Sequence, residues 1–194
     1  MAKQLTIVVV ESRTERARSI RESLEKIGDY RVVVVDDSAV LSRSIAEIRP
    51  DVVLLDMENP TRDALEECAQ VTGPLERPVA MFVDQSGEGL AKSAIEAGLS
   101  AYVVDGLRPE RLKPIIEAAI ARFQMFQRVR KELEATKLAL EERKIIDRAK
   151  GILMKARGLT EEEAYALLRK TAMDQGRKVF DVAEALVTAA GLLA

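Results

Sequence analysis

Residues 1–122 alternate between two hydrophobic periods, and this alternation restricts the possible folds more than any other feature of the chain. Short Val-rich apolar runs suit strands buried on both faces, and the stretches between them are amphipathic with a helical period. The expected strands are residues 5–10, 32–35, 52–55, 79–83 and 101–104, and the expected helices are residues 14–27, 40–48, 64–71 and 90–97. This order predicts an α/β domain with a doubly wound, five-stranded parallel sheet, in which functional groups lie at the carboxyl ends of the strands.

Two residue types that carry much of enzyme and metal chemistry are scarce. The chain has no histidine and a single cysteine, Cys68. This excludes internal disulfides, cysteine-cluster metal sites and histidine-containing catalytic triads. With no Gly-rich phosphate loop either, we predict that the chain is not an enzyme and needs no cofactor beyond a weak Mg²⁺ site. No signal-peptide pattern follows Met1, and no apolar run reaches the ~20 residues that a bilayer requires, so a cytoplasmic location is expected.

An acidic pocket is expected at the carboxyl edge of the sheet. Asp56 ends the third predicted strand in the run DVVLLDMENP at 51–60, and Glu11 follows the first. A carboxylate at this edge can act as a nucleophile toward phosphate. Together with the βα order, these residues make 3–122 resemble the receiver domains of two-component response regulators, which have a flavodoxin-like fold. The resemblance implies that Asp56 matches the phosphoacceptor and that Glu11 and Asp56 are the residues available to hold Mg²⁺.

Three positions depart from the receiver pattern. Receivers place a second acidic residue after the first strand, a Ser or Thr at the end of the fourth, and Lys-Pro after the fifth. This chain has Val10-Glu11-Ser12, in which only Glu11 is acidic, then Val83, and Asp105 followed by Gly106. Phosphoryl transfer depends on positioning and charge neutralisation, and Mg²⁺ prefers complete octahedral oxygen coordination. The sequence therefore favours retention of Asp56 for folding or partner docking, and phosphorylation-dependent control through Asp56 is the alternative.

A single long helix is expected from Pro109 to about Arg157, with Pro114 in its first turn or at a kink. Along it, seam residues recur at spacings of 3, 4, 3 and 4, with charged residues on the flanks. These seam residues are Phe126, Val129, Leu133, Thr136 and Leu140. The heptad pattern predicts a coiled coil that joins two copies of the chain as a homodimer. The alternative is one helix packed against its own domain.

From Arg143 onward the chain is helical in pattern and net basic, whereas the part before it is acidic. Gly158 is expected to end the long helix, and Thr160 and Glu163 predict a capping box that begins the next helix. Gly176 should end that helix, and residues 180–190 form a third with an apolar face. The expected domains are 1–122, receiver-like; 123–142, a coiled-coil linker helix; and 143–194, a three-helix bundle.

The C-terminal region carries the most specific motif of the chain. It reads ERKIIDRAKGILM at 142–154, GLTEEEAY at 158–165 and LRKTAM at 168–173. These residues closely resemble the ANTAR domain, the RNA-binding module of AmiR- and NasT-type transcription antitermination regulators. In the N-terminal part, DMENPTRD at 56–63, MFVD at 81–84 and AYVVDGLRPE at 101–110 look like the NasT-type, nitrate-assimilation branch. The resemblance implies binding of paired hairpins in an mRNA leader, which disfavours a terminator. It also implies control by a nitrate/nitrite-responsive sensor protein.

The residue chemistry gives an independent argument for RNA binding. On a helix, residues 144, 148, 151 and 155 share one face, and Gly151 would let a nucleic-acid backbone approach closely. Tyr165 can stack on an unpaired base, and Arg169 can reach a phosphate. The alternatives are an ordinary solvated face for the basic residues and partial burial of Tyr165 in the bundle. The predicted RNA-binding residues are Lys144, Arg148, Lys150, Gly151, Lys155, Arg157, Tyr165 and Arg169.

Two rival functions fit the sequence less well than RNA binding. A DNA-binding response regulator needs a polar recognition helix, but residues 180–190 contain no Lys or Arg. A phosphotransfer enzyme is disfavoured by the lack of histidine and by the altered acidic pocket. RNA binding is therefore the leading prediction.

Overall fold

The computed structural model describes residues 4–36 and 38–192 of the chain and divides it into two compact units, Met1–Arg128 and Val129–Ala194. The boundary between the units falls inside the predicted linker 123–142. The first three residues of the predicted N-terminal domain and the last two of the predicted bundle lie outside the described residues. Among the helices of the described part, none combines the length and apolar character needed to cross a membrane.

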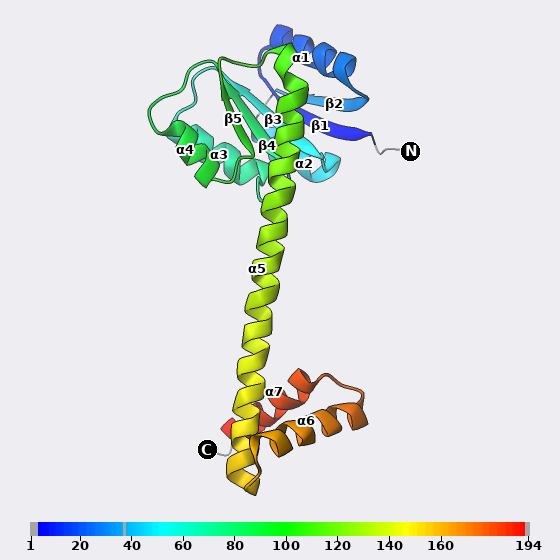
Figure 1. The fold of residues 1–194 in the computed structure, drawn as a ribbon. Coiled ribbons are helices and arrows are strands. Elements are labelled where there is room, and N and C mark those ends of the chain that lie inside the picture. Colours follow the sequence, from blue (N-terminus) through cyan, green and yellow to red (C-terminus); the bar gives the residue numbers. More distant parts are fainter. Residues whose placement is uncertain (1–3, 37, 193–194) are drawn as a thin grey trace. The chain divides into compact units, whose positions relative to one another are not determined.

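The first unit is built on one five-stranded parallel sheet (Figure 1). The strands are β1 (Leu5–Val10), β2 (Tyr30–Val35), β3 (Val52–Met57), β4 (Val79–Val83) and β5 (Ala101–Val104). Their order is β2-β1-β3-β4-β5, the flavodoxin-like order in which the chain adds strands first to one side of β1 and then to the other, so that the strand order reverses between β1 and β3. The predicted doubly wound sheet is confirmed.

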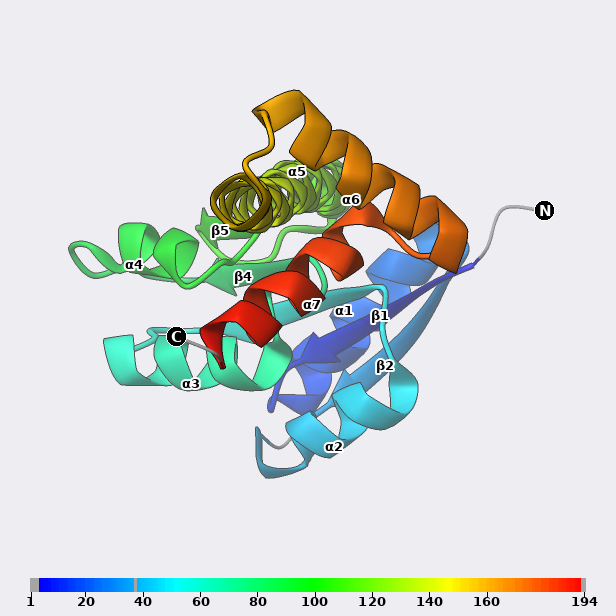
Figure 2. The same cartoon turned by 90° about the horizontal axis from the view of Figure 1, so that it is seen from below.

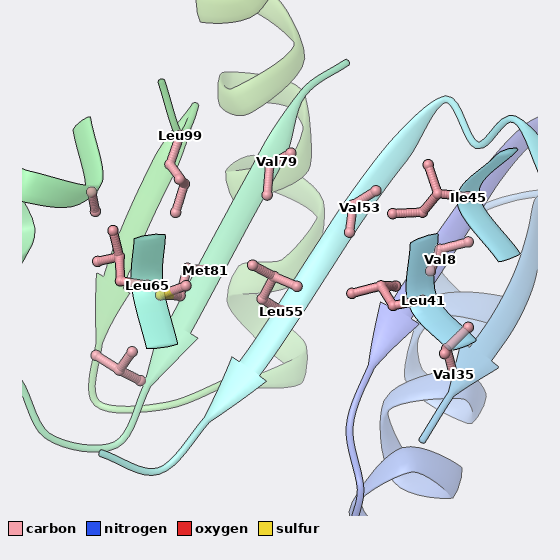
Figure 3. Packing of buried hydrophobic residues seen from close by; sticks show 12 residues of the cluster. Val8, Val35, Leu41, Ile45, Val53, Leu55, Leu65, Val79, Met81 and Leu99 are labelled. Atoms are coloured by element: carbon pink, nitrogen blue, oxygen red, sulfur yellow. The ribbon is translucent and has the colours of Figure 1, made fainter. Parts of the chain in front are cut away.

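Helices cover both faces of this sheet because successive strand side chains point to opposite faces. The helices are α1 (Thr14–Ile27), α2 (Ser38–Ile48), α3 (Arg62–Thr72), α4 (Leu90–Glu96) and the start of α5 (Pro109–Arg157). On one face, Val53 and Leu55 pack with residues of α2, α3 and α4 (Figure 3). On the other, Leu54 and Phe82 pack with residues of α1 and α5. In Figure 2, the helices α2 and α3 lie on one side of the sheet and the start of α5 lies on the other. The hydrophobic clusters on the two faces hold the five strands together, and the carboxyl ends of these parallel strands lie at the same edge of the sheet.

The helix α5 runs without a break for 49 residues, as the sequence predicts. Pro114 lies inside the helix, beyond its first turn, where a proline removes one backbone hydrogen bond. Near its start, Leu112, Ile116 and Ala119 are fully or almost fully buried against the sheet. Residues 128–141 are all exposed. The middle of α5 therefore carries apolar side chains that its own unit leaves in solvent.

The second unit consists of the end of α5 with α6 (Glu161–Gln175) and α7 (Val179–Gly191). Its small core is formed by Ala149, Leu153, Ala164, Leu168 and Ala183, with half-buried neighbours around them. The predicted capping box is confirmed, because the Thr160 hydroxyl accepts from the Glu163 amide and the Glu163 carboxylate accepts from the Thr160 amide. Gly158 and Gly176 end the two helices with φ values of 66° and 61°.

Candidate functional sites

The acidic pocket gathers carboxylates from three strand ends at the carboxyl edge of the sheet. Glu11 directly follows β1, Asp56 is the penultimate residue of β3, and Asp84 directly follows β4. Glu11 and Asp56 are only 3% and 6% exposed. The structure brings together the two acidic residues singled out in the sequence and adds Asp84 as a third member.

An arginine on α1 lies among these carboxylates. The Nε and Nη2 atoms of Arg16 donate to the two carboxylate oxygens of Asp56, with an Nη2–Oδ1 distance of 2.9 Å. Its Nη1 and Nη2 atoms donate to the two oxygens of Asp84 at 3.2 and 2.9 Å. Its Nε atom also lies 3.4 Å from Glu11 Oε2. One guanidinium therefore contacts all three acids.

A second arginine of the same region neutralises Glu11. The backbone amide and the Nε atom of Arg13 donate to Glu11 Oε1 at 2.8 and 3.0 Å, and its Nη2 atom donates to Oε2 at 2.9 Å. The Nη1 atom of Arg13 pairs with Glu58. Sequence reasoning missed both arginines, although each lies within five residues of Glu11 and near the amino end of α1.

The charges of the pocket are shifted by burial and by these contacts. Burial raises the pKa of Asp56 to about 6, against the opposing effect of its hydrogen bonds from Arg16. Burial acts to raise the pKa of Glu11 as well, but the hydrogen bonds from Arg13 outweigh it and lower that pKa. The hydrogen bond to Asp56 raises the pKa of Arg16, so this side chain stays cationic. The pocket thus contains a permanent internal cation.

The loop after β5 approaches the pocket through its glycine. Asp105 has a φ of 75° and its side chain is exposed. Its negative charge therefore lies in solvent and not in the pocket beside Asp56. A Cβ atom on Gly106 would come within 2.5 Å of Asp84 Oδ1 and 3.2 Å of Arg16 Nη2. Val83, at the position where receivers carry Ser or Thr, is fully buried. The backbone at Gly106 therefore packs against the Arg16–Asp84 pair.

A surface groove of about 530 Å³ lies in the second unit, between the end of α5 and the start of α6. Gly151 and Tyr165 both line it, so the structure brings these two predicted residues together. Apart from its two chain neighbours and the nearby backbone of its own helix, no atom of the described residues lies within 4 Å of the position that a Cβ on Gly151 would take. Tyr165 is 45% exposed and is not among the residues of the bundle core. Its ring is therefore accessible from solvent. The other residues that line the groove are Ala139, Glu142, Arg143, Ile146, Asp147, Lys150, Met154 and Glu161.

The predicted basic residues divide into free and paired groups. Arg148, Lys155 and Arg157 are exposed, and among the described residues none of them forms an ion pair. Lys144 is also exposed, but its Nζ atom lies 2.7 Å from Glu141 Oε1. Lys144 pairs with an exposed partner on its own helix, and such pairs exchange readily with other ions.

Lys150 is held between two carboxylates. Its Nζ atom lies 2.6 Å from Asp147 Oδ1 and 2.6 Å from Glu161 Oε1, and only 14% of its side chain is exposed. Hydrogen bonds to these two acids raise the pKa of Lys150, and the bond to Lys150 lowers that of Asp147. Since Glu161 begins α6, this lysine joins the end of α5 to the next helix. Its first role in the structure is to link two helices of the bundle.

Arg169 lines a second, smaller groove of about 380 Å³ on α6, which also contains Tyr165. Met173, 72% exposed, lines the same groove. Tyr165 and Arg169 thus share one exposed face of α6, as their spacing of four predicts. Tyr165 stands between the two grooves and is the residue they have in common.

The predicted seam of α5 is in solvent along its whole length. Phe126, Val129, Leu133 and Leu140 are between 53% and 58% exposed in the single chain. The Thr136 hydroxyl donates to the Glu132 carbonyl at 2.8 Å, so this polar seam position is satisfied within its own helix. The structure leaves the seam without a cover from the described part of this chain.

The C-terminal part of the chain is similar to a known domain family. The model of the ANTAR domain matches residues 134–187. Transcriptional regulatory protein PdtaR of Mycobacterium tuberculosis is 28% identical over 186 residues, which are 95% of this chain and 90% of that protein. A nitrate regulatory protein of Klebsiella oxytoca is 44% identical over 66 residues, which are 34% of this chain and 17% of that protein.

Solved structures resemble the N-terminal part. The receiver domain of Klebsiella pneumoniae RstA, in its BeF₃-activated form, is 27% identical with a TM-score of 0.51, covering 59% of this chain and 97% of that one. A LuxR-family two-component response regulator from Aurantimonas sp. is 26% identical with a TM-score of 0.50, covering 61% of this chain and 86% of that one.

Proposed function

We propose that this chain, which joins a receiver-like domain to an ANTAR domain, is an RNA-binding transcription antitermination regulator that acts in the cytoplasm. It would bind paired hairpins in an mRNA leader and prevent a terminator hairpin from forming. The observation that carries the proposal is the combination of an accessible Tyr165 ring and an open Gly151 in one groove. Exposed Arg148 and Lys155 precede and follow Gly151 on the same helix at the 3- and 4-residue spacings of one helix face.

This combination suits a hairpin loop better than a duplex. Bases of an RNA loop are splayed out and can stack on an aromatic ring, while flanking phosphates pair with Lys or Arg. The open Gly151 surface would let the RNA backbone approach the helix closely. The helix α7 contains no Lys or Arg, so it lacks the residues with which a recognition helix reads the major groove.

We propose further that a sensor protein responsive to nitrate or nitrite controls this regulator by masking it. The proposal is supported by the NasT-like motifs of the receiver-like domain and by the similarity of 66 residues of this chain to a nitrate regulatory protein. It is also supported by the state of Asp56, whose two carboxylate oxygens both accept hydrogen bonds from Arg16. A partner that masks the protein needs no free Asp56 carboxylate.

The function is tested by titrating the full chain with three nucleic acids at one fixed salt concentration. The probes are a two-hairpin leader RNA, the same RNA with scrambled loops, and a DNA duplex of equal length and charge. We expect the leader to bind at least about ten-fold more tightly than either control, because base contacts in the loops add to the phosphate contacts that all probes offer. Equal binding of the duplex DNA would contradict the proposal.

Control without phosphorylation predicts that Asp56→Asn changes little. Asparagine keeps the size of aspartate and one acceptor oxygen for Arg16, but it cannot accept a phosphoryl group. We expect the folded variant to bind the leader RNA with an affinity within about two-fold of the wild type. In cells, expression of a leader–reporter fusion should still depend on nitrate or nitrite. A folded variant that binds RNA normally but no longer changes reporter expression in response to nitrate or nitrite would show that Asp56 is the point of control.

A further inference from the structure

We propose that the guanidinium of Arg16 is the resident counter-ion of the acidic pocket and occupies the place that a divalent cation would need. The pocket then requires no metal to neutralise its buried acids, and Asp56 is closed to phosphorylation. Because this concerns the receiver-like unit alone, the result of the RNA-binding test leaves it unaffected.

The hydrogen bonds of Arg16 use most of its donor capacity. A guanidinium has five N–H donors in one plane, arranged as a fork that fits a carboxylate with two parallel bonds. Arg16 makes four such bonds, two to Asp56 and two to Asp84. The Asp56 side chain is fully buried, whereas the side chains of Arg16 and Asp84 are 28% and 37% exposed, so solvent weakens the bonds to Asp56 less than those to Asp84. The pairing is therefore a fixed part of the fold.

The same oxygens are the ones that a metal or a phosphoryl group would require. Mg²⁺ needs oxygen ligands at about 2.0–2.1 Å in octahedral geometry. Both oxygens of Asp56 instead accept N–H bonds from Arg16, whose Nε atom also lies 3.4 Å from Glu11. In the described part of the chain, no three acidic, cysteine or histidine side chains are placed to hold a metal ion. The pocket residues thus do not fit Mg²⁺ while Arg16 is in place.

The loop after β5 supplies independent support. Gly106 has a φ of 70°, which favours glycine, and a Cβ there would collide with Asp84 Oδ1 at 2.5 Å. It would also lie 3.2 Å from Arg16 Nη2. The backbone after β5 therefore packs directly on the Arg16–Asp84 pair.

The first test uses the unaltered full chain. Its thermal unfolding is followed by circular dichroism with and without millimolar Mg²⁺, and with Mg²⁺ plus beryllofluoride as a mimic of the phosphoryl group. A ligand that binds only the folded state stabilises it by RT ln(1 + [L]/Kd), so the midpoint temperature rises with the ligand concentration once that concentration exceeds Kd. We expect a change of less than about 1 °C with either addition. A concentration-dependent rise with Mg²⁺, or with Mg²⁺ and beryllofluoride, would overturn the proposal.

The second test removes the cation. Arg16→Met keeps a long apolar side chain but leaves Asp56 and Glu11 buried with less compensation, and we expect the midpoint of the receiver-like unit to fall by roughly 5–10 °C. Arg21→Met, an exposed arginine of the same helix, is the matched control and should change little. In an Asp56→Asn background, Arg16→Met should lower the midpoint by less than half as much, because one buried negative charge has already been removed. An equal effect in both backgrounds, or none, would show that Arg16 is not the counter-ion of Asp56. If Arg16→Met fails to fold, the Mg²⁺ and beryllofluoride measurements on the unaltered chain still test the proposal.

Discussion

Replacing Leu133 and Leu140 with aspartate is expected to convert a dimer of this chain into monomers. Both side chains are 53% exposed in the single chain and lie on the heptad seam of α5. Burying a leucine contributes about 1.5–3 kcal/mol, and the double substitution removes four such side chains from a dimer and brings like charges across the seam. We expect the dissociation constant to rise at least about 1,000-fold, as measured by sedimentation velocity across a series of concentrations.

Leu138 offers a matched control for this experiment. It lies on α5 between the two seam leucines and is 63% exposed, but the 3-4 spacing places it on the opposite side of the helix from Leu133 and Leu140. Leu138→Asp makes the same chemical change away from the seam and should leave the dimer intact. A monomeric wild-type chain, or an oligomer that survives the seam substitutions, would show that this face of α5 does not join two copies.

The sheet and helices of the first unit were predictable because each element has a strong and different hydrophobic period. The predicted strands at 79–83 and 101–104 agree with β4 and β5, and the long helix was placed at both of its ends. Helix ends with local chemical signals, such as Thr160 at the start of α6 and Gly176 at its end, were also correct. Pro114 was expected in the first turn or at a kink. It lies deeper in an uninterrupted helix because the packing of Leu112 and Ile116 against the sheet holds the turn around it.

The acidic pocket was less predictable because its decisive member comes from another layer of the fold. Strand ends are easily found in sequence, so Glu11 and Asp56 were identified. Arg16 lies on α1 among several exposed arginines, such as Arg18 and Arg21, and only the packing of that helix against the sheet selects the one that turns inward. Asp105 drew attention because it replaces a family lysine, but its side chain lies in solvent. A charge at the right sequence position does not by itself place that charge in the pocket.

The basic surface of the bundle shows a related limit. Helical spacing groups residues 144, 148, 151 and 155 on one face, but it does not distinguish free cations from those paired within the fold. Lys150 is paired with Asp147 and Glu161. Glu161 belongs to the next helix and lies beside Lys150 only in the folded structure. Replacing Lys150 would therefore disturb the bundle as well as any RNA contact. Arg148 and Lys155 are the better probes of phosphate binding.

Substituting alanine for Arg148 and Lys155 together is expected to lower the affinity for a two-hairpin leader RNA about 100-fold. Each side chain is exposed and has no ion-pair partner among the described residues, so each is available to one phosphate. A hydrogen bond to a charged group contributes about 1.5–3 kcal/mol, or roughly ten-fold or more in affinity per contact. Each lost phosphate contact should also flatten the dependence of log affinity on log salt by roughly 0.7–0.9. The measurement is a titration of the folded dimeric variants at several salt concentrations.

Tyr165 separates base recognition from phosphate binding in the same assay. Tyr165→Ala should weaken leader binding by about 1–3 kcal/mol and reduce the preference for native over scrambled loops, because a stacked base loses its platform. Tyr165→Phe keeps the ring and should keep both affinity and preference. Lys131→Ala, which removes an exposed charge from α5 outside the bundle, is the control for general electrostatic loss. If Arg148 and Lys155 can be removed at no more cost than Lys131, or if Tyr165→Ala retains full loop preference, then the RNA binds a different face of the bundle.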